Sequence, residues 1–127
     1  RCADVTGVQT CALPISEGLT EQFPPYGGNC SVSPSVGEAY QTMFTFECAG
    51  WQTKNMPLLY VVSYYDPYTQ LKPVIYRAEE DRFLVKLALG DSNDNFRLKI
   101  FFSVIDSFGA RMDTQRLIQV SLFFFTR

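Results

Sequence analysis

The stretch FRLKIFFSVID, residues 96–106, has the clearest periodicity in the chain. Apolar side chains recur at every second position from Phe96 to Val104, and Arg97 and Lys99 lie between them. Successive side chains of a β-strand point to opposite faces of a sheet, so this alternation is typical of a strand with one buried and one exposed face. The stretch therefore predicts a strand that lines a hydrophobic core.

The same period of two extends over most of the chain. Turn residues such as Asp66-Pro67 separate the alternating runs, and none of the runs has the spacing of an amphipathic helix. About seven short strands at this spacing predict an all-β fold, a fibronectin-III/Ig-like antiparallel β-sandwich. The expected strands begin near Cys30, Tyr40, Leu58, Val74, Phe83, Phe96 and Leu117.

The composition argues against several classes of function. The chain has 127 residues and no histidine, which excludes His-based triads, Cys–His dyads and His metal sites. Its net charge is −2 with scattered Lys and Arg, so no basic stripe suggests a nucleic-acid partner. Glycine-rich phosphate loops and nucleophile-elbow motifs are missing, and the acidic run Glu79-Glu80-Asp81 is interpreted as a solvated turn. We therefore expect a domain that is not an enzyme and needs no cofactor.

The N-terminal segment is interpreted as foreign to the fold. The run VTGVQTCALPI, from Val5 to Ile15, resembles without a mismatch the translation of a common short-read sequencing adapter. Sequence of this origin is excluded from fold reasoning, so we treat residues 1–16 as an adapter-derived artefact. This interpretation also removes Cys2 and Cys11 from any disulfide argument.

The rest of the chain has the length of about one domain. Residues 17–28 are rich in Pro and Gly and are expected to be a linker, and residues 29–122 contain the alternating runs of the β-sandwich. Residues 123–127 include three consecutive Phe and are treated as a tail of uncertain origin. No apolar run approaches the roughly 18 residues of a membrane span, so we expect no membrane contact by this fragment itself.

Two cysteines, Cys30 and Cys48, remain after this division. They would be two buried free thiols in a cytosolic domain, or one disulfide in an oxidising compartment. Asn29-Cys30-Ser31 is an N-x-S sequon, which makes Asn29 a candidate N-glycosylation site. The cysteine pair and the sequon together favour an extracellular domain.

Residues 91–95, DSNDN, form a cluster of polar side chains. The pattern D-x-N-D-N is similar to the calcium-linker motif of cadherins, and its oxygens suit Ca²⁺. In cadherins the motif closes a repeat and Ala-Pro follows, whereas here Phe96 and two further expected strands follow. We interpret the segment as a solvated loop between strands and expect no metal there. A calcium contact remains the alternative, with the candidate ligands Asp91, Asn93, Asp94 and Asn95.

The run GGNCSVSPSVGEAYQTMFTFECAGW, residues 27–51, carries the most specific pattern in the chain. Its Gly-Gly-x-Cys beginning and Phe-x-Cys-x-Gly-Trp end, followed by Pro-Leu-x-Tyr at Tyr60, resemble the receptor-for-egg-jelly (REJ) module. That module occurs in polycystin-1-like (polycystic kidney disease, PKD) proteins and in the sperm receptor for egg jelly. The run V-x-D-S-x-G-A, with Asp106 and Gly109, is similar to the late hairpin of the module. The resemblance covers residues 27–122.

Single residues of this pattern have physical roles of their own. In immunoglobulin domains the core Trp lies one strand away from the first Cys, whereas Trp51 follows Cys48 by only three residues. The order of Trp51, Pro57 and the run from Tyr60 to Tyr64 looks more like the second and third strands of a fibronectin type III module. Cys30 would then join the first strand to the end of the second, and we predict a Cys30–Cys48 disulfide. Trp51 is expected in the core, where its N–H needs a partner. Gly109 suits a positive φ, and Asp106 can accept hydrogen bonds from nearby backbone.

The resemblance implies the setting of the domain. REJ modules of polycystin-1-like proteins are extracellular, N-terminal to a GPS cleavage site and to a multi-pass membrane region. Such proteins associate with polycystin-type cation channel subunits, and their roles include ligand and mechanical sensing. We therefore expect an extracellular part of a plasma-membrane protein, whose partners are other domains of the ectodomain and, through the full-length protein, a channel subunit. The alternative is an adhesion module of a secreted or single-pass protein without channel association.

Overall fold

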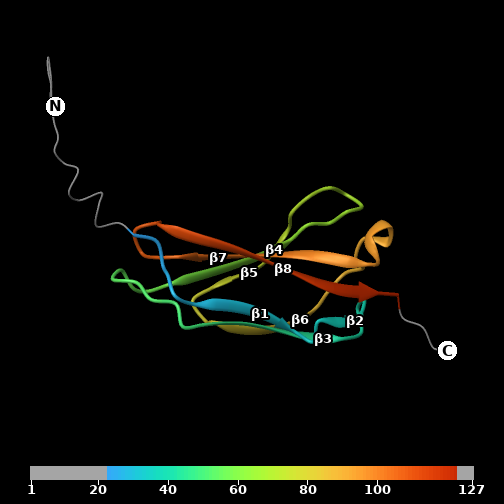
Figure 1. The fold of residues 1–127 in the computed structure, drawn as a ribbon, viewed down its shortest axis with the longest axis horizontal. Coiled ribbons are helices and arrows are strands. Elements are labelled where there is room, and N and C mark those ends of the chain that lie inside the picture. Colours follow the sequence, from blue (N-terminus) through green and yellow to red (C-terminus); the bar gives the residue numbers. More distant parts are fainter. Residues whose placement is uncertain (1–22, 123–127) are drawn as a thin grey trace, which may run out of the picture.

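The computed structural model describes residues 23–122, and its strands form the two layers visible in Figure 1. The interpretations given above for residues 1–16, 17–22 and 123–127 lie outside the described residues. A turn of 3-10 helix, η1 (Ser92–Asp94), lies between the sixth and seventh strands. The strands are β1 (Asn29–Ser33), β2 (Val36–Glu38), β3 (Met43–Ala49), β4 (Leu59–Tyr64), β5 (Val74–Ala78), β6 (Arg82–Lys86), β7 (Arg97–Ile105) and β8 (Arg111–Ser121). The all-β sandwich expected from the sequence is confirmed.

One layer is a three-stranded sheet of order β1-β3-β6, and the other is a five-stranded sheet of order β2-β8-β7-β4-β5. Every pair is antiparallel except β2–β8, which runs parallel from Val36 opposite Gln119 to Glu38 opposite Ser121. The described residues therefore form eight strands, one of which pairs in parallel. About seven strands, all antiparallel, were expected. A strand of three residues is too short to show a period of two, so β2 could not be found by alternation.

The core lies where the inner faces of the two sheets meet. β7 contributes four side chains that are at most 1% exposed, and β3 contributes Phe44, Phe46 and Cys48. The rings of Phe46 and Phe102 have centroids 6.1 Å apart and connect the layers. Burying a side chain of this size stabilises a fold by roughly 1.5–3 kcal/mol, so the alternating residues of β3 and β7 contribute substantially to the stability of the core. The four residues of β7 are Leu98, Ile100, Phe102 and Val104.

Three boundaries differ from the expectation. Tyr40 is 65% exposed with φ 61°, so β3 begins only at Met43. Phe96 also has a positive φ of 60° and precedes β7. β8 begins at Arg111 and not near Leu117, because the first half of this strand is mostly exposed and its polar sequence hides the alternation.

Part of the expected linker packs against the sandwich. Pro25 is fully buried, and Tyr26 exchanges two backbone hydrogen bonds with Gln52, of 3.0 and 2.9 Å. This short bridge lies just before β1 and just after β3. Pro25 and Tyr26 are thus attached to the sandwich by burial and by an isolated bridge beside the three-stranded sheet.

The described chain enters and leaves the sandwich at opposite ends. Phe23 borders a surface hollow together with Asn55, whose carbonyl accepts a hydrogen bond of 2.9 Å from the backbone of Ser107 in the β7–β8 turn. We call this end the hairpin pole. At the other end, Val120 near the end of β8 donates to the carbonyl of Phe96, beside η1; we call it the loop pole. The long strands β7 and β8 connect the two poles, as Figure 1 shows.

Candidate functional site

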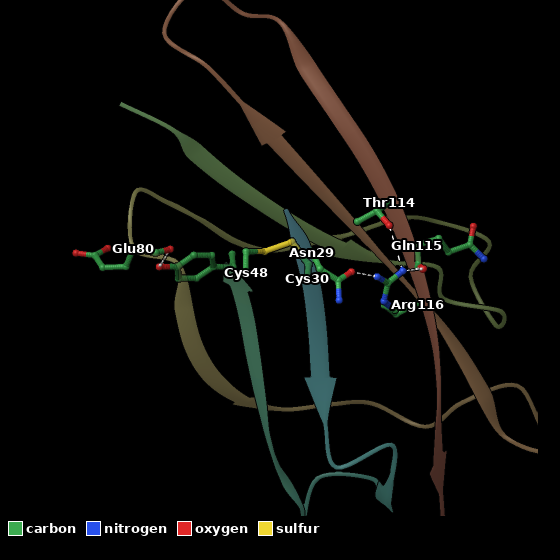
Figure 2. Close-up of a disulfide and its surroundings, with 8 residues drawn as sticks. Asn29, Cys30, Cys48, Glu80, Thr114, Gln115 and Arg116 are labelled. Atoms are coloured by element: carbon green, nitrogen blue, oxygen red, sulfur yellow. Dashed lines mark hydrogen bonds between the residues drawn. A yellow bond between two sulfur atoms is a disulfide. The ribbon is translucent and has the colours of Figure 1, made fainter. Parts of the chain in front are cut away.

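Cys30 on β1 and Cys48 on β3 form a disulfide within one sheet (Figure 2). The two residues lie directly opposite each other, with Cα atoms 4.0 Å apart, and both are buried. The backbone N–H of Cys48 donates to the carbonyl of Asp81, on the side away from β1. The pair is therefore a non-hydrogen-bonded cross-strand pair, the position at which side chains of neighbouring strands come closest. The bridge fastens the edge strand β1 to the central strand of its own sheet.

Asn29 lies beside this bridge, at the exposed start of β1. Its Oδ1 accepts a hydrogen bond from Nη2 of Arg116 on β8. Nη1 of the same guanidinium donates to Oγ1 of Thr114 at 3.1 Å and to the carbonyl of Gln115 at 2.7 Å. Figure 2 shows that the amide nitrogen of Asn29 points away from Arg116. The seam between β1 and β8 is thus closed by an arginine, and Nδ2 remains on the outside.

Trp51 packs against the core from the connection that follows β3. It is half-buried, and its ring lies on the backbone of Gly28, where an added Cβ would come within 2.4 Å of Cγ. A glycine at this position is therefore required by close approach and not by a turn. The indole Nε1 is buried and finds no hydrogen-bond partner among residues 23–122.

Tyr60 on β4 belongs to an aromatic group that closes one side of the core. Phe83 stacks on Phe46 with centroids 4.6 Å apart and on Tyr76 with centroids 3.9 Å apart. Burial, and secondarily the negative charge of Asp81, raises the pKa of Tyr60 above its ordinary value. The phenol therefore stays neutral at physiological pH, and Tyr60 has the chemistry of a packing residue.

Asp106 organises the β7–β8 turn at the hairpin pole. Its side chain is 4% exposed, and Oδ1 accepts hydrogen bonds of 2.9 Å from the backbone N–H groups of Phe108 and Ala110. Oδ2 accepts a longer bond of 3.4 Å from Nδ2 of Asn55, which precedes β4. Gly109 has φ +92° and so occupies the position where a side chain would be strained. The carboxylate thus holds the turn and ties it to the start of a neighbouring strand.

Residues 91–95 form an exposed turn at the loop pole. Oδ1 of Asp91 accepts a hydrogen bond of 2.9 Å from the N–H of Asn93, and Asn95 ends η1 in the left-handed region with φ 56°. Oδ1 of Asp94 lies 3.2 Å from Nη2 of Arg97. Arg97 and Lys99 border the same surface hollow as Asp91 and Asp94. Two positive side chains beside the carboxylates oppose the binding of Ca²⁺, and this arrangement supports a solvated loop.

Chemistry-bearing side chains are dispersed over the sandwich. Across the described part of the chain there is no group of three or more His, Cys, Asp or Glu side chains that could hold a metal ion. A helix suited to spanning a bilayer is likewise not found between residues 23 and 122. The distinctive features of the domain are therefore the buried Cys30–Cys48 bridge, with the exposed Asn29 beside it, and the two poles.

Sequence reasoning missed Arg116 and Gly28 as partners of the residues that it did identify. Arg116 and Asn29 are separated by 87 positions, and only the packing of β8 beside β1 brings them together. Gly28 could be suspected because it precedes the sequon, but its contact with Trp51 depends on the fold.

These features define a small two-layer β-sandwich with one disulfide inside its smaller sheet, a bond that is typical of proteins in oxidising compartments. A family model of the REJ domain matches residues 16–127, and the chain belongs to the REJ domain family. REJ domains are non-catalytic modules that occur in polycystin-1-like proteins, where they are extracellular. No curated protein and no solved structure matches the chain.

Proposed function

We propose that this chain is an extracellular, non-catalytic module of a polycystin-1-like multi-pass membrane protein. In that protein it contributes to ligand or mechanical sensing and to signalling that involves a polycystin-type cation channel subunit. The observation that carries the proposal is the REJ domain match over residues 16–127. The buried Cys30–Cys48 bridge supports it, because disulfides persist mainly in oxidising compartments.

The position of the two chain ends supports a role as one module in a series. The described chain begins at the hairpin pole and ends at the loop pole, so neighbouring domains of the same ectodomain would meet opposite ends of the sandwich. Phe23 and Tyr26 are 65% and 55% exposed at the hairpin pole and border a hollow there. Exposed aromatic side chains of this kind suit contact with another protein surface. We infer that a neighbouring ectodomain module contacts this pole.

Sequencing the full transcript by long reads from an adapter-free library tests the proposal. We expect residues 1–16 to be absent and the frame to continue past Val120 into a GPS motif and several apolar spans of about 20 residues each. A frame that closes soon after this domain would contradict the multi-pass parent.

A second candidate function is an adhesion module of a secreted or single-pass cell-surface protein without channel association. The same exposed aromatic residues at the hairpin pole favour it, since they fit contact with another chain as well as contact with a neighbouring domain. A transcript that runs into one apolar span of about 20 residues supports this second function and removes the channel association.

A further inference from the structure

The sequon Asn29-Cys30-Ser31 is part of a strand whose central residue is bonded to another strand. Asn29 lies opposite Ala49, Cys30 opposite Cys48 and Ser31 opposite Glu47. The side chains of Asn29 and Ser31 are exposed, whereas Cys30 has no exposed surface. The two side chains that define an N-glycosylation acceptor therefore face outward, while the residue between them is fixed in the core.

This position limits when a glycan can be attached. A glycosyltransferase must enclose the acceptor peptide to reach both Nδ2 of Asn29 and the hydroxyl group of Ser31. In the folded protein one edge of this peptide is hydrogen-bonded to β3, and the Cys30–Cys48 bond anchors its middle residue. The acceptor is thus available only while β1 is free, which means before the disulfide has closed.

We propose that N-glycosylation of Asn29 and closure of the Cys30–Cys48 disulfide compete during synthesis, so that the protein is produced in a glycosylated and an unglycosylated form. The inference rests on the proposed function, because both reactions require the secretory route. In the first reaction Nδ2 of Asn29 loses a proton and bonds to the anomeric carbon of a lipid-diphosphate-linked oligosaccharide, and the lipid diphosphate leaves. In the second, two thiols lose two protons and two electrons to a disulfide of a luminal oxidoreductase, which is reduced to a dithiol.

The spacing of the cysteines sets a period in which the sequon is accessible. The bridge joins residues 18 positions apart, and at about 5–20 residues per second that interval takes roughly 1–4 s to synthesise. Asn29 therefore exists for at least this time without the partner of Cys30. Disulfide formation then takes seconds to hours, and the sequon stays accessible until the bond closes.

The folded structure accepts either product. Asn29 is exposed, and its contact with Arg116 uses Oδ1, so a sugar on Nδ2 leaves that hydrogen bond in place. A glycosylated chain can still form the bridge afterwards, because the side chain of Cys30 points into the core and away from the glycan (Figure 2). The two forms differ in whether the seam between β1 and β8, beside Thr114 and Arg116, is covered by an oligosaccharide.

The test expresses the full 127-residue chain behind a cleavable signal peptide in secretory cells, with Cys2→Ser and Cys11→Ser so that only Cys30 and Cys48 can pair. The glycosylated fraction is measured on pulse-labelled chains as the mobility shift removed by a peptide N-glycosidase. Because Asn29-Cys30-Ser31 is the single N-x-S/T sequence in the chain, every shift reports Asn29. We expect partial modification, and a rise of about two-fold or more when dithiothreitol is present during the pulse or when Cys48→Ala removes the competing thiol.

Two control variants separate this competition from other effects. Ser31→Ala destroys the sequon and must abolish the shift, whereas Arg116→Ala removes a contact of the folded state alone and must leave the fraction unchanged. Complete modification without reductant overturns the proposal, and so does a fraction that stays constant, at zero or above, under both treatments. The signal peptide imposes the secretory route, so these outcomes are independent of the transcript structure that tests the proposed function.

Discussion

Within each of the two sheets, the strands are joined to one another by different means. The three-stranded sheet has strands of five to seven residues, and its edge strand β1 is fixed by a covalent bond inside the sheet. The five-stranded sheet has no disulfide among its described residues, but its central pair joins a strand of nine residues, β7, to one of eleven, β8. The covalent bond therefore lies in the smaller sheet, away from the longest hydrogen-bonded ladder, which joins β7 to β8.

The comparison also separates the two kinds of stabilisation. The larger sheet provides more of the buried side chains than the smaller sheet, from Val62 on β4 to Val120 on β8. The smaller sheet provides two large aromatic residues, Phe44 and Phe46, and the disulfide. We therefore expect substitutions in the larger sheet to act through burial, and substitutions of the cysteines to act through the unfolded chain.

The largest effect is expected for Phe102→Ala on β7. Phe102 is 1% exposed and meets Phe46 across the core, so the truncation removes buried surface from both layers. The free energy of unfolding should fall by about 3–5 kcal/mol, measured by chemical denaturation. The matched control is Phe101→Ala, which truncates the neighbouring side chain on the other face, where Phe101 is only half-buried. Equal losses for the two variants would contradict the assignment of the faces.

A smaller loss is expected when the bridge is removed by the double substitution Cys30→Ala and Cys48→Ala. A disulfide that closes a loop of this length stabilises a protein by roughly 3 kcal/mol, mainly by restricting the unfolded chain. Intact mass of secreted residues 17–127, whose only cysteines are Cys30 and Cys48, should confirm the bond with a gain of about 2 Da on reduction as one S–S bond becomes two S–H groups. Two reactive thiols before reduction would refute the bridge and weaken the distinction between the sheets.

The two poles allow a third test, because an aspartate at each pole accepts hydrogen bonds from backbone N–H groups. Asp106→Ala leaves the N–H groups of Phe108 and Ala110 without their acceptor, and we expect a loss of about 1–3 kcal/mol in unfolding free energy. Asp91→Ala removes a similar hydrogen bond, but in an exposed turn, and should cost at most about 0.5 kcal/mol. Thermal melts of both variants at one pH give the comparison, and a reversed order would contradict the described burial.

Asp113 on β8 should make a small contribution that depends on pH. Hydrogen bonds from Arg111 and Ser103 hold the pKa of this carboxyl below its ordinary value of 3.8. A pKa lowered in the folded state gives stability that is present above the unfolded value and is lost as the pH falls through the folded one. Asp113→Asn should therefore reduce the fall in melting temperature between neutral and acidic solution. The effect is small because the pair is largely exposed.

Calcium is expected to have no effect on stability. A ligand that binds only the folded state must raise the melting temperature, and Arg97 and Lys99 oppose a cation beside Asp91 and Asp94. Titration to millimolar calcium should leave the melting temperature unchanged. A rise that disappears in Asp94→Asn would instead establish the cadherin-like alternative.

The sequence could predict features that depend on near neighbours. Alternation placed the four buried residues of β7, because a strand buried on one face has no other periodicity. The hydrogen bonds of Asp106 span at most four positions, apart from the one to Asn55, and so belong to the turn itself.

Features that depend on distant segments could not be predicted. The parallel pairing of β2 with β8 needs the sheets to be in place, since three residues carry no period. The close contact between Gly28 and Trp51, and the hydrogen bond between Arg116 and Asn29, likewise follow from how the strands assemble. The sequence thus named Trp51 and Asn29 as candidate residues, but could not supply their partners.

The position of the disulfide also decides how tension would pass through this module. β2 lies between Cys30 and Cys48 along the chain, so with the bond closed a pull on the two chain ends crosses from Cys30 directly to Cys48. The parallel pair β2–β8 is then bypassed, and the 18-residue interval cannot extend. At roughly 3.3–3.6 Å per residue, the bond withholds about 60 Å of contour length from the unfolded chain. Reduction of the disulfide would allow this interval to extend and would place the β2–β8 hydrogen bonds under shear.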